Sequence, residues 1–183
     1  MQRLKWFILS VAVLLALTLF GAVASAQNGD ALLRFVHVVP GAQAIDIYVD
    51  GQRTVAGLEY GQGTDYLSVP SGTYTVAVTQ TGLTTTLWEQ SITVTSDTAS
   101  TLVASSISKL SFTIYTDSLA SLDLGKARVT VIHAIADGPS VDALIAGNRS
   151  VFPDLQYNTP TGTIDLDLSV EYPMAIVPAN EGV

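Results

Sequence analysis

Short runs in which apolar and polar residues alternate cover most of the chain beyond residue 30. The clearest is TYTVAVT at residues 73–79, where a tyrosine and two valines share one face and the threonines occupy the other. Residues 45–49, IDIYV, alternate in the same way. A period of two indicates a β-strand with one buried face. Further strands are predicted at residues 32–39, 66–69, 84–94, 101–107 and 112–115.

Turn sequences separate these runs. Residues 70–72 (PSG), 81–82 (TG) and 96–97 (SD) are typical of chain reversals. No amphipathic helix is indicated after residue 26, and the many Thr and Val residues favour strands. Short strands at this spacing predict an antiparallel β-sandwich or barrel.

One phrase of the sequence occurs twice. FVHVVPGAQAIDIYVDG at residues 35–51 returns as VIHAIADGPSVDALIAG at residues 131–147, and weaker matches continue at offsets that grow from 96 to 98. Small slips at turns are typical of two copies of one domain. We therefore predict a first domain at 31–116, a linker at 117–126 and a second domain at 127–183. Nothing in the second copy matches residues 87–115, so we expect a fragment of a longer protein; completion by a strand from another chain is the alternative.

The hairpin of the repeated phrase allows a register prediction. A three-residue loop at residues 49–51, with Gly51 in the left-handed conformation, sets Val55 opposite Ile45. The equivalent loop of the second copy sets Val151 opposite Val141. One register then pairs apolar residues in both copies.

The first 26 residues predict export. Arg3 and Lys5 precede an apolar run at residues 6–20, and Ala24-Ser25-Ala26 is a small-x-small cleavage signal. We expect a helical signal peptide at 1–26, cleaved after Ala26, and a secreted, periplasmic or cell-surface protein. The alternative is an uncleaved membrane anchor, since about 20 apolar residues span a bilayer; no other membrane contact is expected.

Charge and cysteine content narrow the class of partner. The chain has a formal charge of −8, which removal of Arg3 and Lys5 would take to −10. A surface of that sign repels phosphate backbones, so no nucleic-acid partner is expected. The chain has no Cys, which excludes both disulfides and lipid attachment at a cysteine.

The repeated phrase belongs to a longer resemblance. Residues 34–51, RFVHVVPGAQAIDIYVDG, followed by YLSVPSGTYTVAV at 66–78, resemble the 4397 domain-of-unknown-function family over nearly all of residues 32–119. The resemblance implies exported bacterial β-sandwich modules, commonly in tandem and often in envelope or surface proteins, without established catalytic residues. With it, we expect an all-β chain of two tandem immunoglobulin-like or prealbumin-like β-sandwiches, the second incomplete.

The repeated His and Asp residues are the first candidates for chemistry. His37 and Asp46 are nine residues apart, as are His133 and Asp142, which raises the question of a catalytic dyad or a metal site. Strand parity places each His on the apolar face of its strand and each Asp on the opposite, solvent-facing side. We therefore predict buried histidines whose ring nitrogens bond to the backbone. One His per copy also falls short of the three or four ligands that zinc prefers.

Other reactive patterns are weak. The sequence has no G-x-S-x-G elbow, and Asp165 and Asp167 are interpreted as a solvated strand face. Asp50, Asp137 and Asp154 fall in predicted turns but lack the spacing of a calcium loop. We expect no metal, no cofactor and no catalytic residue.

Two aromatic residues bear on ligand binding. Trp88 is in phase with apolar residues and is predicted to face the core. Tyr48, on the polar face of its strand, and the neighbouring Asp50 are the candidate ligand-binding residues. The second copy has Leu144-Ile145-Ala146 in place of Tyr48-Val49-Asp50, which argues against a function of Tyr48 and Asp50 that both copies share.

These observations favour a non-catalytic exported module of the cell envelope or extracellular space, with a protein or a cell-surface polymer as its partner. The alternative is a carbohydrate-binding module attached to a larger secreted protein or enzyme. A hydrolase would be the third possibility, for which the sequence offers no residue.

Overall fold

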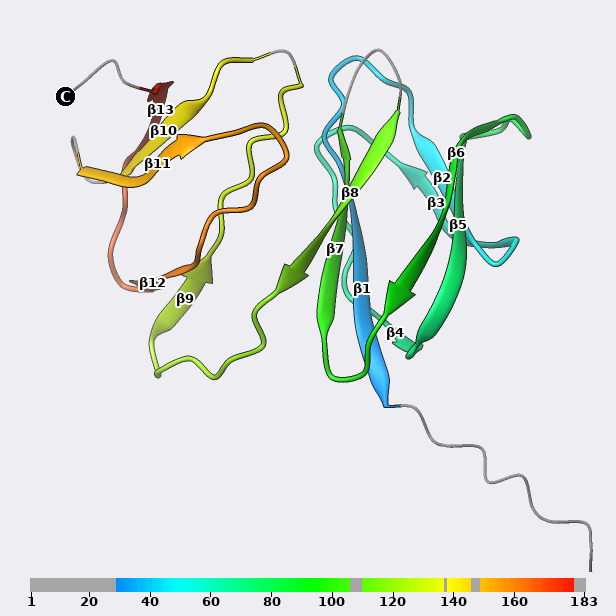
Figure 1. The fold of residues 1–183 in the computed structure, drawn as a ribbon, viewed down its shortest axis with the longest axis horizontal. Coiled ribbons are helices and arrows are strands. Elements are labelled where there is room, and N and C mark those ends of the chain that lie inside the picture. Colours follow the sequence, from blue (N-terminus) through cyan, green and yellow to red (C-terminus); the bar gives the residue numbers. More distant parts are fainter. Residues whose placement is uncertain (1–28, 106–109, 137, 146–148, 180–183) are drawn as a thin grey trace, which may run out of the picture.

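The computed structural model describes residues 29–105, 110–136, 138–145 and 149–179, and these form an all-β protein with thirteen strands (Figure 1). The predicted signal peptide at 1–26, with its helix, lies outside the described residues. Within the described part of the chain, no helix is long and apolar enough to cross a membrane.

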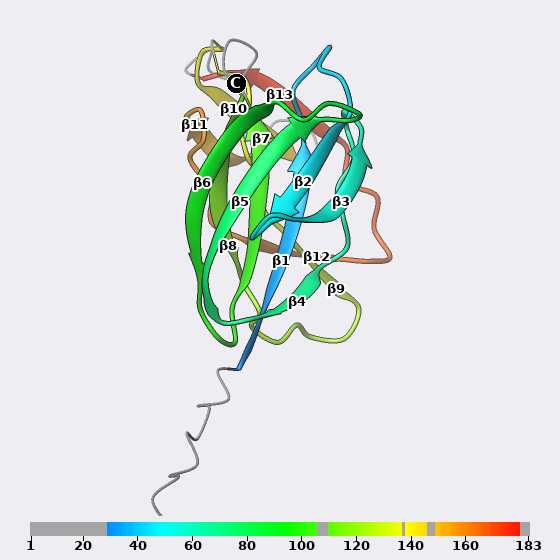
Figure 2. The ribbon, with the colours of Figure 1, turned by 90° about the vertical axis from the view of Figure 1, so that its right-hand side faces the viewer.

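The first eight strands form one group, which we call the first strand group. β1, β7, β8 and β4 make one sheet in the order β4-β1-β7-β8, and the other four strands make a second sheet in the order β3-β2-β5-β6 (Figure 2). Every pairing is antiparallel except that of β1 with β7, which is parallel. The strands are β1 (Asp30–His37), β2 (Ile45–Val49), β3 (Gln52–Leu58), β4 (Leu67–Pro70), β5 (Gly72–Gln80), β6 (Thr86–Val94), β7 (Ala99–Ser105) and β8 (Ser111–Asp117).

The predicted alternation explains the core of this group. Along β1 every second residue is buried, and the same holds for the valines of β5. Both sheets contribute to a single hydrophobic cluster, which includes Phe35 of β1, Ile47 of β2, Val78 of β5 and Leu102 of β7. Each of the predicted strands between residues 32 and 115 is present, with ends that differ by a few residues.

The remaining strands form the second strand group. They make a two-stranded sheet, β12-β9, and a three-stranded sheet, β11-β10-β13 (Figure 1). Its hydrophobic cluster has three buried residues, Ala143, Phe152 and Leu155. The strands are β9 (Lys126–Val129), β10 (Val141–Ile145), β11 (Arg149–Leu155), β12 (Ile164–Asp167) and β13 (Met174–Pro178).

The hairpin between β2 and β3 is tighter than the sequence predicts. Val49 pairs with Gln52, so the loop holds Asp50 and Gly51 alone, with φ angles of 48° and 77°. Two successive left-handed residues are typical of the type I′ turn of two-residue hairpins. The left-handed Gly51 is confirmed, whereas the predicted three-residue loop is wrong.

Two register shifts in the β2–β3 ladder explain the error. They place Val55 opposite Ile47 and Leu58 opposite Ile45, instead of Val55 opposite Ile45. Each shift inserts one extra residue in β3 and returns an apolar side chain to the core face. The sequence prediction assumed an uninterrupted ladder and compensated for it with a longer loop.

The predicted register of the second hairpin is also wrong. Leu155, rather than Val151, lies opposite Val141 in the β10–β11 ladder, which contains two register shifts as well. The loop residues 146–148, including Gly147, lie outside the described residues.

The two strand groups contact each other through side-chain hydrogen bonds. The hydroxyl of Ser105 lies 3.1 Å from that of Tyr157 and donates to Oδ1 of Asn158 at 3.2 Å. Tyr115 donates to the same Asn158 oxygen at 3.2 Å. Ser105 and Tyr115 are buried, so these bonds fix the position of the second group against β7 and β8.

Candidate functional site

His37, at the end of β1, lies in the interior of the first strand group and is fully buried. Its Nδ1 accepts a hydrogen bond from the backbone N–H of Val39, and its Nε2 lies 3.4 Å from the carbonyl oxygen of Gln43. Burial lowers the pKa of His37, an effect that the bond to Gln43 partly opposes. The predicted buried histidine with backbone partners is confirmed.

His133 repeats this arrangement. Its Nδ1 accepts from the N–H of Ile135, and its Nε2 lies 2.9 Å from the carbonyl oxygen of Pro139. In both strand groups the ring therefore bonds to the carbonyl oxygen of the residue six positions further along the chain.

Asp46 departs from the prediction that it faces solvent, because its exposed fraction is only 2%. Its Oδ1 accepts hydrogen bonds from the N–H of Gly57 and the hydroxyl of Thr81, each at 2.8 Å, and Arg53 donates to Oδ2 at 3.3 Å. The N–H of Gly57 contributes most to lowering the pKa of Asp46, and Thr81 and Arg53 add to the effect. Strand parity did not predict this burial, because it depends on the register shifts of β3, which bring the N–H of Gly57 to the Asp46 carboxylate.

The second strand group holds its equivalent carboxylate in a similar way. Asp142 accepts a hydrogen bond from the N–H of Asp154 at 2.7 Å. Gly57 and Asp154 are both left-handed, with φ angles of 65° and 51°. The carboxylates therefore fix irregular backbone in β3 and β11, and the described hydrogen bonds of His37 and His133 involve neither of them.

Asp50, one of the two candidate ligand-binding residues, is engaged within its own hairpin. Its backbone N–H donates to the carbonyl oxygen of Thr75 at 2.8 Å, and its Oδ1 accepts from the N–H of Thr75 at 2.7 Å. A left-handed Asp that bonds to the neighbouring strand is typical turn chemistry.

Tyr48, the other candidate, lies beside a shallow hollow on the outer face of the β3-β2-β5-β6 sheet. The ring is half-buried. The hydroxyl of Thr79 is buried here without a hydrogen-bond partner among the described residues. The hollow has a volume of about 270 Å³ and is lined by Tyr48, Gly51, Ala77, Thr79, Thr84 and Thr86.

The remaining candidates have structural surroundings. Trp88 packs against the core, with its ring centroid 4.7 Å from that of Phe112, which confirms the core prediction. Asp165 forms two hydrogen bonds of 2.8 Å with Arg128, its neighbour across the β9–β12 ladder. The carboxylate of Asp167 lies 2.7 Å from Nζ of Lys126 in the same ladder. Asp165 and Asp167 are exposed, as predicted, but the sequence did not indicate their basic partners.

No group of three or more His, Cys, Asp or Glu residues suited to a metal ion occurs within the described ranges. Of the acidic turn residues considered for calcium, Asp137 lies outside those ranges.

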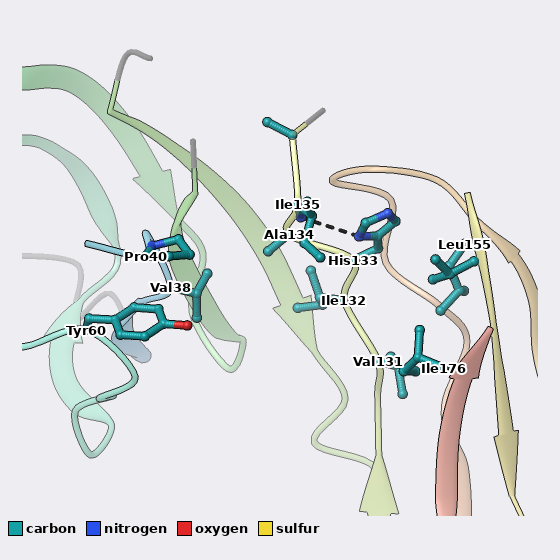
Figure 3. A pocket seen from close by; sticks show the side chains of 12 residues that line it. Val38, Pro40, Tyr60, Val131, Ile132, His133, Ala134, Ile135, Leu155 and Ile176 are labelled. Carbon is teal, nitrogen blue, oxygen red and sulfur yellow. Dashed lines mark hydrogen bonds between the residues drawn. The ribbon is translucent and has the colours of Figure 1, made fainter. Parts of the chain in front are cut away.

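A larger, apolar cavity opens at the second strand group (Figure 3). It has a volume of about 470 Å³. His133, with its bond to Ile135, lies between Ile135 and Leu155, and Val38, Pro40 and Tyr60 of the first group lie on the other side of the cavity. The other lining residues are Val131, Ile132, Ala134, Ala136, Val141, Leu155 and Ile176.

The exposure of β13 shows why this cavity exists. Met174 and Ile176 pair with β10 in the register in which Val76 and Val78 of β5 pair with β2. The exposed fractions of Met174 and Ile176 are 49% and 57%, whereas Val76 and Val78 are fully buried. The second strand group thus presents to solvent a face that the first group buries, and the periodicity of residues 174–178 did not reveal this.

A polar cleft of about 740 Å³ separates the β4-β1-β7-β8 sheet from β9. Here the guanidinium carbon of Arg34 lies 4.6 Å from the ring centroid of Tyr66, and Nη2 lies 3.5 Å from the Asp117 carboxylate. Tyr66 also donates to Asp117 at 2.9 Å. Burial raises the pKa of Tyr66, and the hydrogen bond to the Asp117 carboxylate raises it further. Arg34 directly precedes the repeated phrase, yet the sequence analysis did not identify it as part of a site.

Comparison with known families matches residues 31–144 to one described as a domain of unknown function, DUF4397. This confirms the resemblance seen in residues 34–51 and 66–78 and extends the match into β10. Comparison with curated proteins gives no match.

Proposed function

The chain belongs to the DUF4397 family, and from this premise we propose that it is a non-catalytic interaction module of the cell envelope or extracellular space. The observation that carries the proposal is the exposed apolar face of the second strand group, with Met174, Ile176 and the adjoining cavity. Exposed apolar patches of this kind mark interaction sites in soluble proteins.

The surroundings of the titratable residues favour binding over catalysis. His37 and His133 bond to backbone groups, and Asp46 and Asp142 bond to the backbone of β3 and β11. A general base must lie within hydrogen-bond reach of the proton it removes. Of these four residues, His133 alone lines the apolar cavity, and both of its ring nitrogens have backbone partners.

We further propose that each strand group is an immunoglobulin-like or prealbumin-like β-sandwich and that the second is an incomplete tandem copy. Matched hydrogen bonds support this. Thr64 and Thr161 accept from the N–H groups of Phe35 and Val131 at 3.1 and 3.0 Å, respectively. The order β11-β10-β13 also corresponds to β3-β2-β5. Export of the module rests on the sequence of residues 1–26.

The experiment is a co-sedimentation assay of the exported full chain with cell envelopes from the source organism. We expect saturable association, which protease treatment of the envelopes abolishes if the partner is a protein. A glycan panel is screened in parallel. Absence of association with both the envelopes and the glycans would contradict the proposal, and so would turnover of a substrate by the purified chain.

A carbohydrate-binding module is the second candidate, favoured by the hollow beside Tyr48. The Thr79 hydroxyl, which has no hydrogen-bond partner within the described ranges, and the ring of Tyr48 could contact a sugar by hydrogen bonding and stacking. If the hollow binds glycans, Tyr48→Ala abolishes that binding, whereas Ser91→Ala, on an exposed position of β6, leaves it unchanged. Equal binding by both variants would exclude the hollow as the sugar site.

A further inference from the structure

The polar cleft between the two strand groups has the composition of a site for a hydroxylated ligand. Its volume of about 740 Å³ falls within the range of roughly 300–1,000 Å³ that is typical of ligand pockets. Among the described residues that line it, only Val129, Ile132 and Pro160 lack a polar side-chain group. Hydroxyl groups line both walls: Thr101, Tyr115 and Thr116 in the first group, and Thr130, Thr161 and Thr163 in the second.

Hydrogen bonds hold the two walls of this cleft in place. Nη1 of Arg128, on β9, donates to the hydroxyl of Ser118 at 3.1 Å and to the carbonyl oxygen of Ala120 at 2.8 Å. Elsewhere along the contact, the amide oxygen of Asn158 accepts from the first group, as described above. A cleft that is already formed does not have to be ordered by its ligand, which reduces the cost of binding.

Arg34 is the side chain of the cleft that is best prepared to contact a ligand. Its Nε donates to the hydroxyl of Thr101 at 2.7 Å, and its guanidinium lies against the ring of Tyr66. Asp117 accepts from the hydroxyls of both Tyr66 and Thr101. No hydrogen bond from Nη1 of Arg34 is found among the described residues, and the side chain is 38% exposed. The guanidinium is thus fixed in position while it keeps donors for a ligand.

Each guanidinium of the cleft is matched by a carboxylate. Asp117 lies beside Arg34, and Asp165 accepts two hydrogen bonds of 2.8 Å from Arg128. The cleft therefore offers donors and acceptors without a net charge, in a chain whose formal charge is −8. A polyanion gains no charge compensation in the cleft and is repelled by the rest of the chain. A neutral ligand rich in hydroxyl groups can use both the donors and the acceptors.

The cleft lies outside both hydrophobic clusters. Arg34 alternates with the buried Leu33 and Phe35 along β1, which places it on the outer face of its sheet. Thr130 takes the corresponding position before Val131, which packs against the cluster of the second group. Strands that extended the sheet of β9 as β7 and β8 extend that of β1 would lie in the plane of the sheet. The outer faces that line the cleft do not depend on them.

We propose that this cleft binds a neutral glycan chain, an inference that rests on the proposed non-catalytic interaction module and names the class of polymer that it recognises. Arg34 donates to sugar oxygens, and Asp117 accepts from a sugar hydroxyl. The ring of Tyr66, which is 37% exposed, packs against the apolar face of a sugar. The hydroxyls of the opposite wall contact the same chain from its other side.

The geometry favours a glycan over two other ligands. An extended peptide gains affinity by pairing with a strand edge, but Arg34 and Thr101 lie on β1 and β7, which are paired on both sides. A lipid chain would leave the guanidinium and the hydroxyls without hydrogen-bond partners, which costs free energy. A glycan satisfies these groups without a strand edge.

The test measures binding of the exported full chain to immobilised oligosaccharides of glucose, mannose and N-acetylglucosamine, with oligogalacturonate as the acidic comparison. We expect saturable binding to a neutral oligosaccharide and none to oligogalacturonate. Arg34→Ala and Tyr66→Ala should each weaken binding about tenfold, the effect of losing one hydrogen bond to a charged group or one stacked ring. Tyr66→Phe keeps the ring and should bind within about threefold of the unchanged chain.

Two matched controls lie on the other sheet of the first group. Arg53→Ala removes an ion-paired arginine and Tyr48→Ala a half-buried tyrosine, and each should change the affinity by less than about twofold. In the unchanged chain, which does not depend on the folding of a variant, the oligosaccharide should shift the backbone amide resonances of Thr101, Asp117 and Thr130.

Three results would overturn the proposal. The first is absence of binding to every neutral oligosaccharide, and the second is binding to oligogalacturonate alone. The third is binding that Tyr48→Ala abolishes and Arg34→Ala leaves unchanged, because the hollow beside Tyr48 is then the sugar site.

The cleft and the interaction module fail separately. Hydrolysis of the bound oligosaccharide would contradict the non-catalytic module and leave the cleft as the binding site. Envelope association that Arg34→Ala leaves unchanged, without binding of any oligosaccharide, would support the module and contradict the cleft.

Discussion

The Asp46 carboxylate provides the sharpest test of how the first strand group is held together. Asp46→Ala removes the acceptor for two hydrogen bonds of 2.8 Å, from the N–H of Gly57 and the hydroxyl of Thr81. A hydrogen bond to a charged group contributes about 1.5–3 kcal/mol. Because both donors are partly solvated, the lower value applies to each, and the substitution is expected to lower the unfolding free energy by about 3 kcal/mol.

Two variants separate the hydrogen bonds from the charge. Asp46→Asn keeps a carbonyl oxygen that can accept from Gly57 and Thr81. Because neutral hydrogen bonds are weaker than those to a charged group, the unfolding free energy should fall by about 1 kcal/mol. Arg53→Ala removes a 3.3 Å contact from a side chain that is 57% exposed, and exposed ion pairs contribute about 0–1 kcal/mol. The expected order of destabilisation is therefore Asp46→Ala, then Asp46→Asn, then Arg53→Ala.

Urea unfolding measures these differences through the midpoint and the slope. Because the pKa of Asp46 is lowered, the contribution of its charge is present above the unfolded value of 3.8 and is lost as the pH falls through the folded value. The comparison is therefore made at pH 7. Loss of less than about 0.5 kcal/mol in Asp46→Ala, within the range of surface substitutions, would refute the reasoning. An Arg53→Ala effect as large as that of Asp46→Ala would refute it too.

Three further outcomes are expected. Burial lowers the pKa of His37, so below pH 6.5 the unfolded chain binds more protons than the folded chain. The unfolding free energy therefore falls as the pH drops through 6.5, by at most about 1.4 kcal/mol per pH unit. Urea unfolding at pH values between 7.5 and 5.5 should show a weaker dependence of the unfolding free energy on pH in His37→Gln. Asp50→Ala loses the bond to Thr75 and strains a left-handed position, which predicts a loss of about 1–2 kcal/mol in chemical unfolding, whereas Asp50→Gly should cost less. Trp88→Ala removes the contact with Phe112 and should lower the unfolding free energy by about 3 kcal/mol, the lower limit for such core substitutions, because Trp88 is half-buried. The thermal unfolding midpoint should fall accordingly, and an unchanged midpoint would place Trp88 outside the core.

Alternation was enough to predict the strands and the inward direction of His37. The period of two reports which face of a strand is apolar, and β1 and β5 follow it closely. Comparison of the sequence with itself located the repeated phrase, because residues that hold the same backbone geometry recur in the same register.

The same rule failed where a ladder is irregular. The inserted residues of β3 shift the β2–β3 register, bring the Gly57 N–H over β2 and bury Asp46. Nothing in the local pattern distinguishes such a bulge from a longer loop, because both restore apolar pairing. The exposure of Ile176 was equally hidden, since whether an apolar face is covered depends on strands distant in sequence.

The positions at which the two strand groups differ are therefore better guides to function than those that they share. His37 and His133, and likewise Asp46 and Asp142, hold loops and bulges in equivalent ways. Gly61 and Asn158 show the contrast. Both are left-handed, with φ angles of 82° and 57°, but only Asn158 has a side chain, and it accepts hydrogen bonds from Ser105 and Tyr115 across the contact between the groups. Shared residues maintain the backbone, whereas a departure such as Asn158 creates a contact that the first group lacks. By the same reasoning, the open face around Ile176 is where binding should be sought first.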